Sequence, residues 1–82
     1  MDRAEMLKKI NDIFKKVFED KDLAISERTC SEDIEDWDSL AQITLVTEVE
    51  DLFGIQFLLE DITKMKDVGD MMDVIERELV SR

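Results

Sequence analysis

The chain lacks histidine, tyrosine and proline, and it has only two glycines and one cysteine among its 82 residues. Without histidine, no side chain ordinarily changes its charge near neutral pH, so a self-sufficient enzyme with a general base is not expected. The scarcity of glycine and proline disfavours turn-rich β architectures and favours helices. The lone Cys30 cannot form an internal disulfide and has no histidine to activate it as a nucleophile.

Long apolar runs are missing as well. No stretch approaches the roughly 20 residues of a membrane-spanning helix, and the charged first residues do not resemble a signal peptide. We therefore expect a soluble, cytoplasmic protein without a membrane span. With 44% hydrophobic and 40% charged residues, a chain of this length has material for one core, so residues 1–82 are expected to form a single domain.

The whole chain has a net charge of −11. Most of this negative charge lies in the middle of the chain. Residues 1–18 carry five bases and three acids (net +2), and residues 64–82 carry four bases and five acids (net −1). Residues 19–63 carry fourteen acids and two bases, a net charge of −12. Such a segment repels nucleic acid and anionic membranes and attracts basic protein surfaces. It indicates either a docking role or charge that merely keeps a small protein in solution.

The spacing of apolar residues predicts an all-α fold. Amphipathic helices are expected over about residues 3–18, 39–53 and 68–80, with one short helical turn over 60–64. Three long helices and one short one, with a long loop after the first, would form a small four-helix bundle.

Short local signals mark the ends of these helices. Asp2 with Glu5 is a candidate capping box, Asp67 is the expected N-cap of the last helix, and Gly54 is a natural stop for the second. The expected core residues are Met6, Leu7, Ile10, Ile13, Phe14, Val17 and Phe18; then Leu45, Val49, Leu52 and Phe53, flanked by Leu40, Ile43 and Val46; then Ile62 and Met65; and finally Met71, Met72, Ile75 and Leu79.

The long connection over residues 19–38 is rich in acids and small polar residues. Four apolar anchors are expected to pack it onto the bundle: Leu23, Ile25, Ile34 and Trp37. Loops of this length inside a compact domain are typical of functional segments. A calcium-binding loop from Asp20 fails, because Ala24 takes the third ligand position and Ser31 replaces the closing glutamate. No metal site is expected.

The candidate functional residue is Ser39, where the acidic connection meets the second helix. Asp38 is a preferred N-cap residue, which places Ser39 at the first helical position with its hydroxyl toward solvent. Backbone N–H groups without helical partners and the positive end of the helix dipole would stabilise an anion attached to that oxygen. A phosphodiester-linked group suits this position. Alternatively, Ser39 and Gln42 form only a structural S-x-x-Q capping box.

The triplet Asp38-Ser39-Leu40 opens the second of four helices, and Val68-Gly69-Asp70 opens the last. With the acidic helix after the triplet, these features resemble acyl carrier proteins over the whole chain. The resemblance implies that Ser39 carries covalent 4′-phosphopantetheine, attached from coenzyme A by a phosphopantetheinyl transferase (a holo-carrier-protein synthase). An acyl intermediate would then be held on the arm as a thioester, and the chain would be a monomeric carrier, not an enzyme.

Partners of this family dock on the outward face of the second helix. The matching positions in this chain are Ile43, Thr44, Thr47, Glu50 and Asp51. The resemblance implies acyl-loading and acyl-using enzymes with basic docking surfaces as partners, with Ile43 as the apolar contact. Partial burial of Ile43 and an ordinary solvated face for the acids are the alternatives.

Two departures from the pattern of fatty-acid carriers bear on which biosynthetic pathway the carrier would serve. Asp36 stands where many fatty-acid carriers have glycine, and Thr44 and Thr47 stand where acidic or bulkier apolar residues are common. They favour a specialised biosynthetic pathway over housekeeping fatty acid biosynthesis. An aminoacyl or peptidyl carrier and an unmodified acidic helical interaction module remain alternatives.

A crevice for the acyl chain is a further possibility within the bundle. Its candidate lining residues are Leu45, Val49, Phe57, Ile62, Met65 and Met72. Methionine adapts readily to a guest chain. Ordinary core packing is the alternative for each of these residues.

Overall fold

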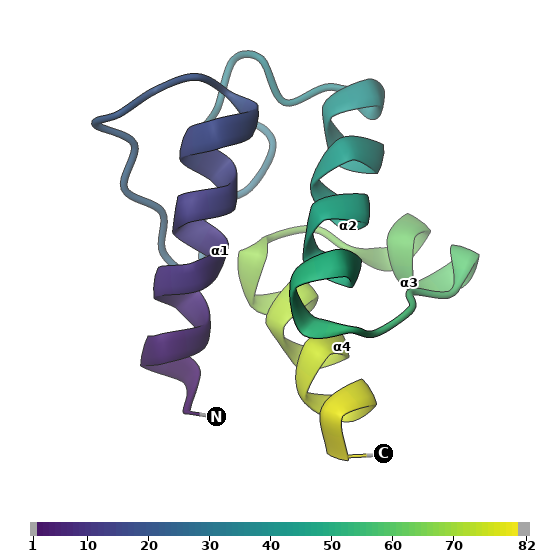
Figure 1. Ribbon diagram of the computed structural model, residues 1–82. Helices are drawn as coiled ribbons and strands as arrows, with labels where there is room; N and C mark the ends of the chain where they lie inside the picture. Colours follow the sequence, from purple (N-terminus) through teal and green to yellow (C-terminus); the bar gives the residue numbers. More distant parts are fainter. Residues whose placement is uncertain (1, 81–82) are drawn as a thin grey trace.

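The computed structural model describes residues 2–80, which form four α-helices and no β-strand. The helices are α1 (Arg3–Val17), α2 (Ser39–Phe53), the short α3 (Leu59–Lys64) and α4 (Val68–Val80). In Figure 1, α1 and α2 lie side by side and run in opposite directions, and α2 begins at the end of the molecule away from both termini. The predicted all-α bundle is confirmed, with helix bounds within one residue of those expected.

The helix ends carry the caps that their local signals predict. Of the capping box expected at Asp2 and Glu5, the structure shows one half: Asp2 Oδ1 accepts a hydrogen bond from the backbone N–H of Glu5 at 2.8 Å. Asp67 Oδ1 accepts one from Asp70 N–H at 2.9 Å. Gly54 closes α2 in the left-handed conformation, at φ 65° and ψ 39°. A side chain disfavours that conformation, so a glycine there ends the helix at little cost.

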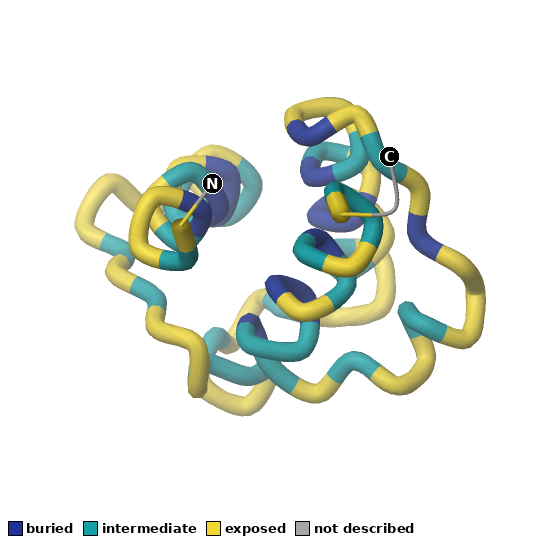
Figure 2. Tube along the Cα trace, turned by 90° about the horizontal axis from the view of Figure 1, so that it is seen from below, coloured by how far each residue is buried: buried dark blue, intermediate teal, exposed yellow. Residues whose placement is uncertain are grey.

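The core lies between α1, α2 and α4, whose buried positions face one another in Figure 2. Its buried residues are Met6, Ile10, Ile13, Phe14, Leu45, Val46, Val49, Phe53, Phe57, Val68, Met71, Met72 and Ile75. The prediction that Leu52 belongs to the core is wrong, because its side chain is 50% exposed and Val46 is buried on the adjoining side of α2. The expected inward residues of the short helix, Ile62 and Met65, are half-buried at the margin of this core.

The loop between α1 and α2 is packed onto the bundle, as its apolar anchors predict. Leu23, Ile25, Ile34 and Trp37 are all partly buried against the core. The side chain of Asn11 fastens the loop to α1, donating to Leu23 O at 3.2 Å and accepting from Ile25 N–H at 2.8 Å. This long segment is therefore an ordered part of the domain.

The same loop is also bonded to the start of α4. Gly69 N–H donates to Glu27 O at 2.7 Å, and Val68 N–H donates to Thr29 O at 2.9 Å. A Cβ at position 69 would lie 3.0 Å from Glu27 O, so the close approach of the two segments favours glycine. Cys30 is half-buried beside this contact, pairs with Asp67 through an isolated β-bridge, and packs into the fold as an ordinary small residue.

Ion pairs of two arginines join segments at the surface of the bundle. Arg3 of α1 bonds Glu27 of the loop and Glu76 and Asp73 of α4, and its hydrogen bonds lower the pKa of the Glu27 carboxyl. Arg77 of α4 donates to Asp61 of α3 at 2.7 Å and lowers the pKa of that carboxyl. α3 contains no fully buried residue, and this ion pair joins it to α4 in addition to the packing of the half-buried Ile62 against the core.

Candidate functional site

Ser39 is the first residue of α2 and is exposed to solvent. Asp38 precedes it as N-cap, with extended backbone at φ −108° and ψ −170°, and Asp38 Oδ1 accepts a hydrogen bond from Ala41 N–H at 2.8 Å. Within residues 2–80 the Ser39 hydroxyl and the backbone N–H groups of Ser39 and Leu40 have no hydrogen-bond partner. An accessible hydroxyl beside free N–H donors suits a phosphodiester, whose oxygens accept hydrogen bonds at a helix N-terminus.

Gln42 does not form the capping box with Ser39 that its spacing allows. Its side-chain Oε1 accepts a 2.6 Å hydrogen bond from the indole Nε1–H of Trp37. The Trp37 ring packs edge-on against Phe14 of α1, with ring centroids 5.2 Å apart, and lies 6.4 Å from the ring of Phe18. Trp37 thus joins the first turn of α2 to α1 and orients the helix end that carries Ser39.

The sequence reasoning placed Trp37 only as a loop anchor and missed its bond to Gln42. The sequence does contain a signal for this contact. Trp37 immediately precedes the N-cap Asp38, and Gln42 is the fourth residue of the helix. Side chains at these two positions commonly pack together, in the arrangement called a hydrophobic staple.

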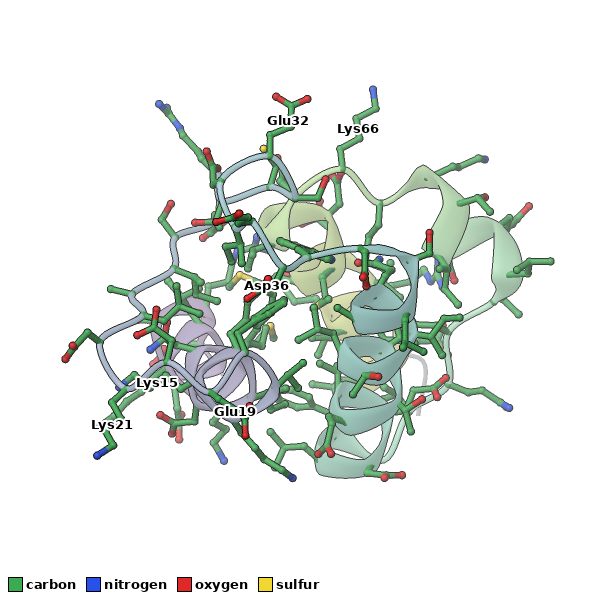
Figure 3. All side chains as sticks on the ribbon, turned by 90° about the horizontal axis from the view of Figure 1, so that it is seen from above. Lys15, Glu19, Lys21, Glu32, Asp36 and Lys66 are labelled. Carbon is green, nitrogen blue, oxygen red and sulfur yellow. The ribbon has the colours of Figure 1, made fainter. Side chains whose placement is uncertain are left out.

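A groove of about 530 Å³ opens beside Ser39, between the start of α2 and the α3 region. Its apolar lining includes Trp37, Ile43, Leu59, Ile62 and Met65, and its polar lining includes Ser31, Asp38, Gln42 and Lys66. In Figure 3, which looks down on this end of the molecule, Lys66 projects outward from its margin. The groove therefore offers both apolar surface and hydrogen-bonding groups next to the point where a group attached to Ser39 would begin.

Only part of the expected crevice lining belongs to this groove. Ile62 and Met65 line it. Leu45, Val49 and Met72 are completely buried and Phe57 nearly so, which makes these four residues part of the packed core. These four residues are therefore ordinary core residues, which was the alternative to a crevice lining.

The outward face of α2 is apolar along its first turns. Leu40 is 73% exposed and Ile43 60% exposed, so the expected alternative of a partly buried Ile43 is not observed. The hydroxyls of Thr44 and Thr47 donate back to Leu40 O and Ile43 O, at 3.0 and 2.9 Å. With these hydroxyls bonded to the helix, the two threonines add little polarity to the face.

The acids of α2 lie in its second half and differ in their surroundings. Glu50 is half-buried, and its Oε2 accepts a hydrogen bond from Phe57 N–H at 2.8 Å, so this carboxylate braces the turn after α2. Glu48 accepts from Lys16 Nζ of α1 at 3.1 Å. Asp51 is exposed and, with the exposed Leu52, lines a groove between α1 and α2.

Residues 2–80 contain no cluster of three or more acidic or cysteine side chains able to hold a metal ion. No helix within the same range is long and apolar enough to cross a membrane.

A scan against protein-family models gave no match, and neither did a search of curated protein sequences. Among solved structures, the holo acyl carrier protein of Geobacter metallireducens is 33% identical, with 92% of this chain and 86% of that chain covered and a TM-score of 0.85. The acyl carrier protein of Thermotoga maritima is 25% identical, with 99% and 94% covered and a TM-score of 0.86.

These similarities extend over nearly the whole length of both partners and include the helix that begins with the exposed serine. Both neighbours are named as acyl carrier proteins. On this identity, coverage and shared fold, the chain belongs to the acyl carrier protein family.

Proposed function

We propose that Ser39 carries 4′-phosphopantetheine and that residues 1–82 act as one carrier domain, presenting an acyl intermediate as a thioester. The observation that supports this most directly is the exposed, unbonded hydroxyl at the first position of α2, in a chain of this family. The chain itself supplies the tether and the docking surfaces, and the chemistry belongs to its partners.

Attachment of the group is a phosphoryl-transfer step at Ser39 Oγ. A bond forms from Oγ to a phosphorus of coenzyme A, the pyrophosphate bond breaks, and adenosine 3′,5′-bisphosphate leaves. The serine proton passes to a base of the transferase, since this chain has no histidine. The free N–H groups of Ser39 and Leu40 and the dipole of α2 stabilise the negative phosphodiester that results.

The terminal thiol of the arm supplies the thioester chemistry. Tethering keeps the acyl group near a partner's active site at high effective concentration, so the partner need not bind free substrate tightly. The ordered start of α2, held by Asp38 and Trp37, gives the arm a fixed origin.

Partner enzymes, including the phosphopantetheinyl transferase, contact the outward face of α2. Ile43 provides the apolar contact, Thr44 and Thr47 extend it, and Asp51 offers an exposed charge to a basic docking surface. Glu50 belongs to the same proposed set, although one of its oxygens is already bonded to Phe57 N–H.

The pathway served is a specialised one. The first nine residues of α2, Ser39–Thr47, carry no charge, so an enzyme that recognises acids at the start of this helix finds none there. Assay of the acylated protein with a fatty-acid ketosynthase tests this point, and turnover equal to that of an ordinary fatty-acid carrier would contradict it. This uncharged first part of α2 also favours the aminoacyl or peptidyl carrier as second candidate, which loading by an adenylating enzyme would reveal.

Intact-mass measurement tests the attachment itself. The protein is incubated with coenzyme A and a broad-specificity phosphopantetheinyl transferase, beside the variants Ser39→Ala and Ser31→Ala. Ser31 is a matched control, because it is an exposed serine lining the same groove. The wild type and Ser31→Ala should each gain one phosphopantetheinyl group, and Ser39→Ala none. A wild type that stays unmodified would favour the plain interaction module instead.

A further inference from the structure

The side-chain amide of Gln42 is held in one orientation in the groove beside Ser39. Its Oε1 accepts the 2.6 Å hydrogen bond from Trp37 Nε1–H. An indole N–H can only donate, so the amide atom that faces it is the oxygen, and the amide nitrogen takes the other side. The indole ring is itself fixed by its edge-on contact with Phe14. Trp37 therefore determines on which side the N–H groups of Gln42 lie.

These N–H groups have no acceptor within the described part of the chain. No hydrogen bond from Gln42 Nε2 is formed within residues 2–80, and the half-buried side chain lines the groove together with Ser39. Gln42 follows Ser39 by three residues, which puts the two side chains on the same face of α2. Long side chains on a helix also lean toward its N-terminus. An oriented donor without an acceptor thus lies next to the point where a group on Ser39 would begin.

The surroundings of this donor are largely apolar. The apolar side chains that line the same groove of about 530 Å³ include those of Trp37, Ile43, Ile62 and Met65. A ligand that fits the groove therefore combines methyl groups or other apolar surface with a hydrogen-bond acceptor close by.

We propose that Gln42 and Trp37 hold the first organic unit of the arm on Ser39, the pantoyl unit, in this groove. The inference rests on the proposed function, because this unit is present only when Ser39 carries phosphopantetheine. The pantoyl unit follows the phosphate and consists of a carbon with two methyl groups, a hydroxyl and an amide carbonyl. The methyl groups pack against the apolar wall at Trp37 and Ile43. The hydroxyl or the carbonyl oxygen accepts a hydrogen bond from Gln42 Nε2–H.

This contact fixes the base of the arm and leaves its far end free. The phosphodiester stays with the free backbone N–H groups of Ser39 and Leu40, and Gln42 binds the next unit one turn further along α2. The thiol and its acyl group lie at the other end of the arm and take no part. Gln42 thus sets the direction in which the arm leaves the carrier. A partner enzyme then meets an arm that has less conformational freedom to lose on binding.

The composition of the chain makes a nuclear magnetic resonance test simple. Trp37 is the only tryptophan, and the only side-chain amides are those of Asn11, Gln42 and Gln56. Nitrogen-15-labelled protein is recorded before and after conversion to the phosphopantetheinyl form, and intact mass establishes the conversion. The signals of the Gln42 amide and the Trp37 indole should shift several-fold more than those of Asn11 and Gln56, which do not line the groove. Nuclear Overhauser effects should join the two methyl groups of the arm to the Trp37 ring.

Two variants with the same added charge isolate the contribution of the donor. Gln42→Glu keeps an oxygen for Trp37 Nε1–H but has no N–H to donate. Gln56→Glu is the matched control, because Gln56 is exposed and lies outside the groove. Loss of one hydrogen bond should move the arm in Gln42→Glu about fivefold or more toward its undocked state. The Overhauser effects to Trp37 should weaken accordingly, and those of Gln56→Glu should match the wild type.

The outcomes separate this inference from the proposed function. A modified wild type without Overhauser effects to Trp37, or with an unmoved Gln42 amide signal, overturns the inference and leaves Ser39 as the attachment point. Undiminished effects in Gln42→Glu overturn it as well. A wild type whose mass does not change removes the proposed function and this inference with it. Should Gln42→Glu fail to fold in thermal unfolding, Gln42→Met, which also lacks the donor, must show the same loss beside Gln56→Met.

Discussion

Asp38 has a structural role that two substitutions can separate from its charge. Its Oδ1 accepts the hydrogen bond of Ala41 N–H at 2.8 Å and so satisfies one of the free donors at the start of α2. Alanine cannot accept this bond, and loss of such a cap costs about 1 kcal/mol. For a domain of this size, about 1 kcal/mol corresponds to a fall in Tm of about 4–8 °C.

Asparagine keeps a side-chain oxygen in the capping position. Asp38→Asn should therefore lose only the attraction of a carboxylate for the helix N-terminus, about 0.3–1 kcal/mol. Relief of repulsion in this acidic chain offsets part of that loss. Thermal unfolding followed by circular dichroism should rank the wild type and Asp38→Asn close together, with Asp38→Ala clearly below. If Asp38→Ala melts with the wild type, or if both variants fall equally, the capping argument is refuted.

Three further predictions concern the core, the ion pair between α3 and α4, and the groove beside Ser39. Leu45→Ala should destabilise the fold by about 2–5 kcal/mol, measured by urea unfolding, because Leu45 is completely buried; a loss below 1 kcal/mol would point to an open crevice. The hydrogen bonds from Arg77 lower the pKa of Asp61 below its ordinary value of 3.8, so their stabilisation is complete above that pH and is lost as the pH falls through the lowered pKa. The difference in Tm between Asp61→Asn and the wild type should accordingly be full at pH 7 and shrink in acid, and a difference independent of pH would contradict this. Modification of Ser39 should change the emission of Trp37, which lines the same groove, and an unchanged spectrum would place the arm elsewhere.

The helix bounds were predictable from the sequence because their signals are local. The caps at Asp2 and Asp67 and the stop at Gly54 each act through bonds within one turn of the helix. The face of α2 was harder to assign, since apolar residues occur on nearly every side of this helix. Periodicity alone could not choose between Leu52 and Val46, and packing against α1 and α4 decides it.

The candidate site, too, was predictable from the sequence only where its signals are local. The position of Ser39 follows from Asp38 alone, because an N-cap fixes which residue comes first in the helix. The bond from Phe57 N–H to Glu50 depends on how the chain turns after α2, and seven residues separate the two partners. The surface groove that brings Glu19 together with Asp36 and Asp38 depends on the end of α1 meeting the start of α2, which no short sequence pattern encodes.

The bonds of Gly69 and Val68 to the loop have a consequence for engineering. Residues 26–30 and the first turn of α4 behave as one module, since two backbone hydrogen bonds join them at a separation that leaves little space for a side chain at position 69. Grafting a loop from another carrier, to redirect this protein to new enzymes, would therefore succeed only if the matching start of α4 travelled with it.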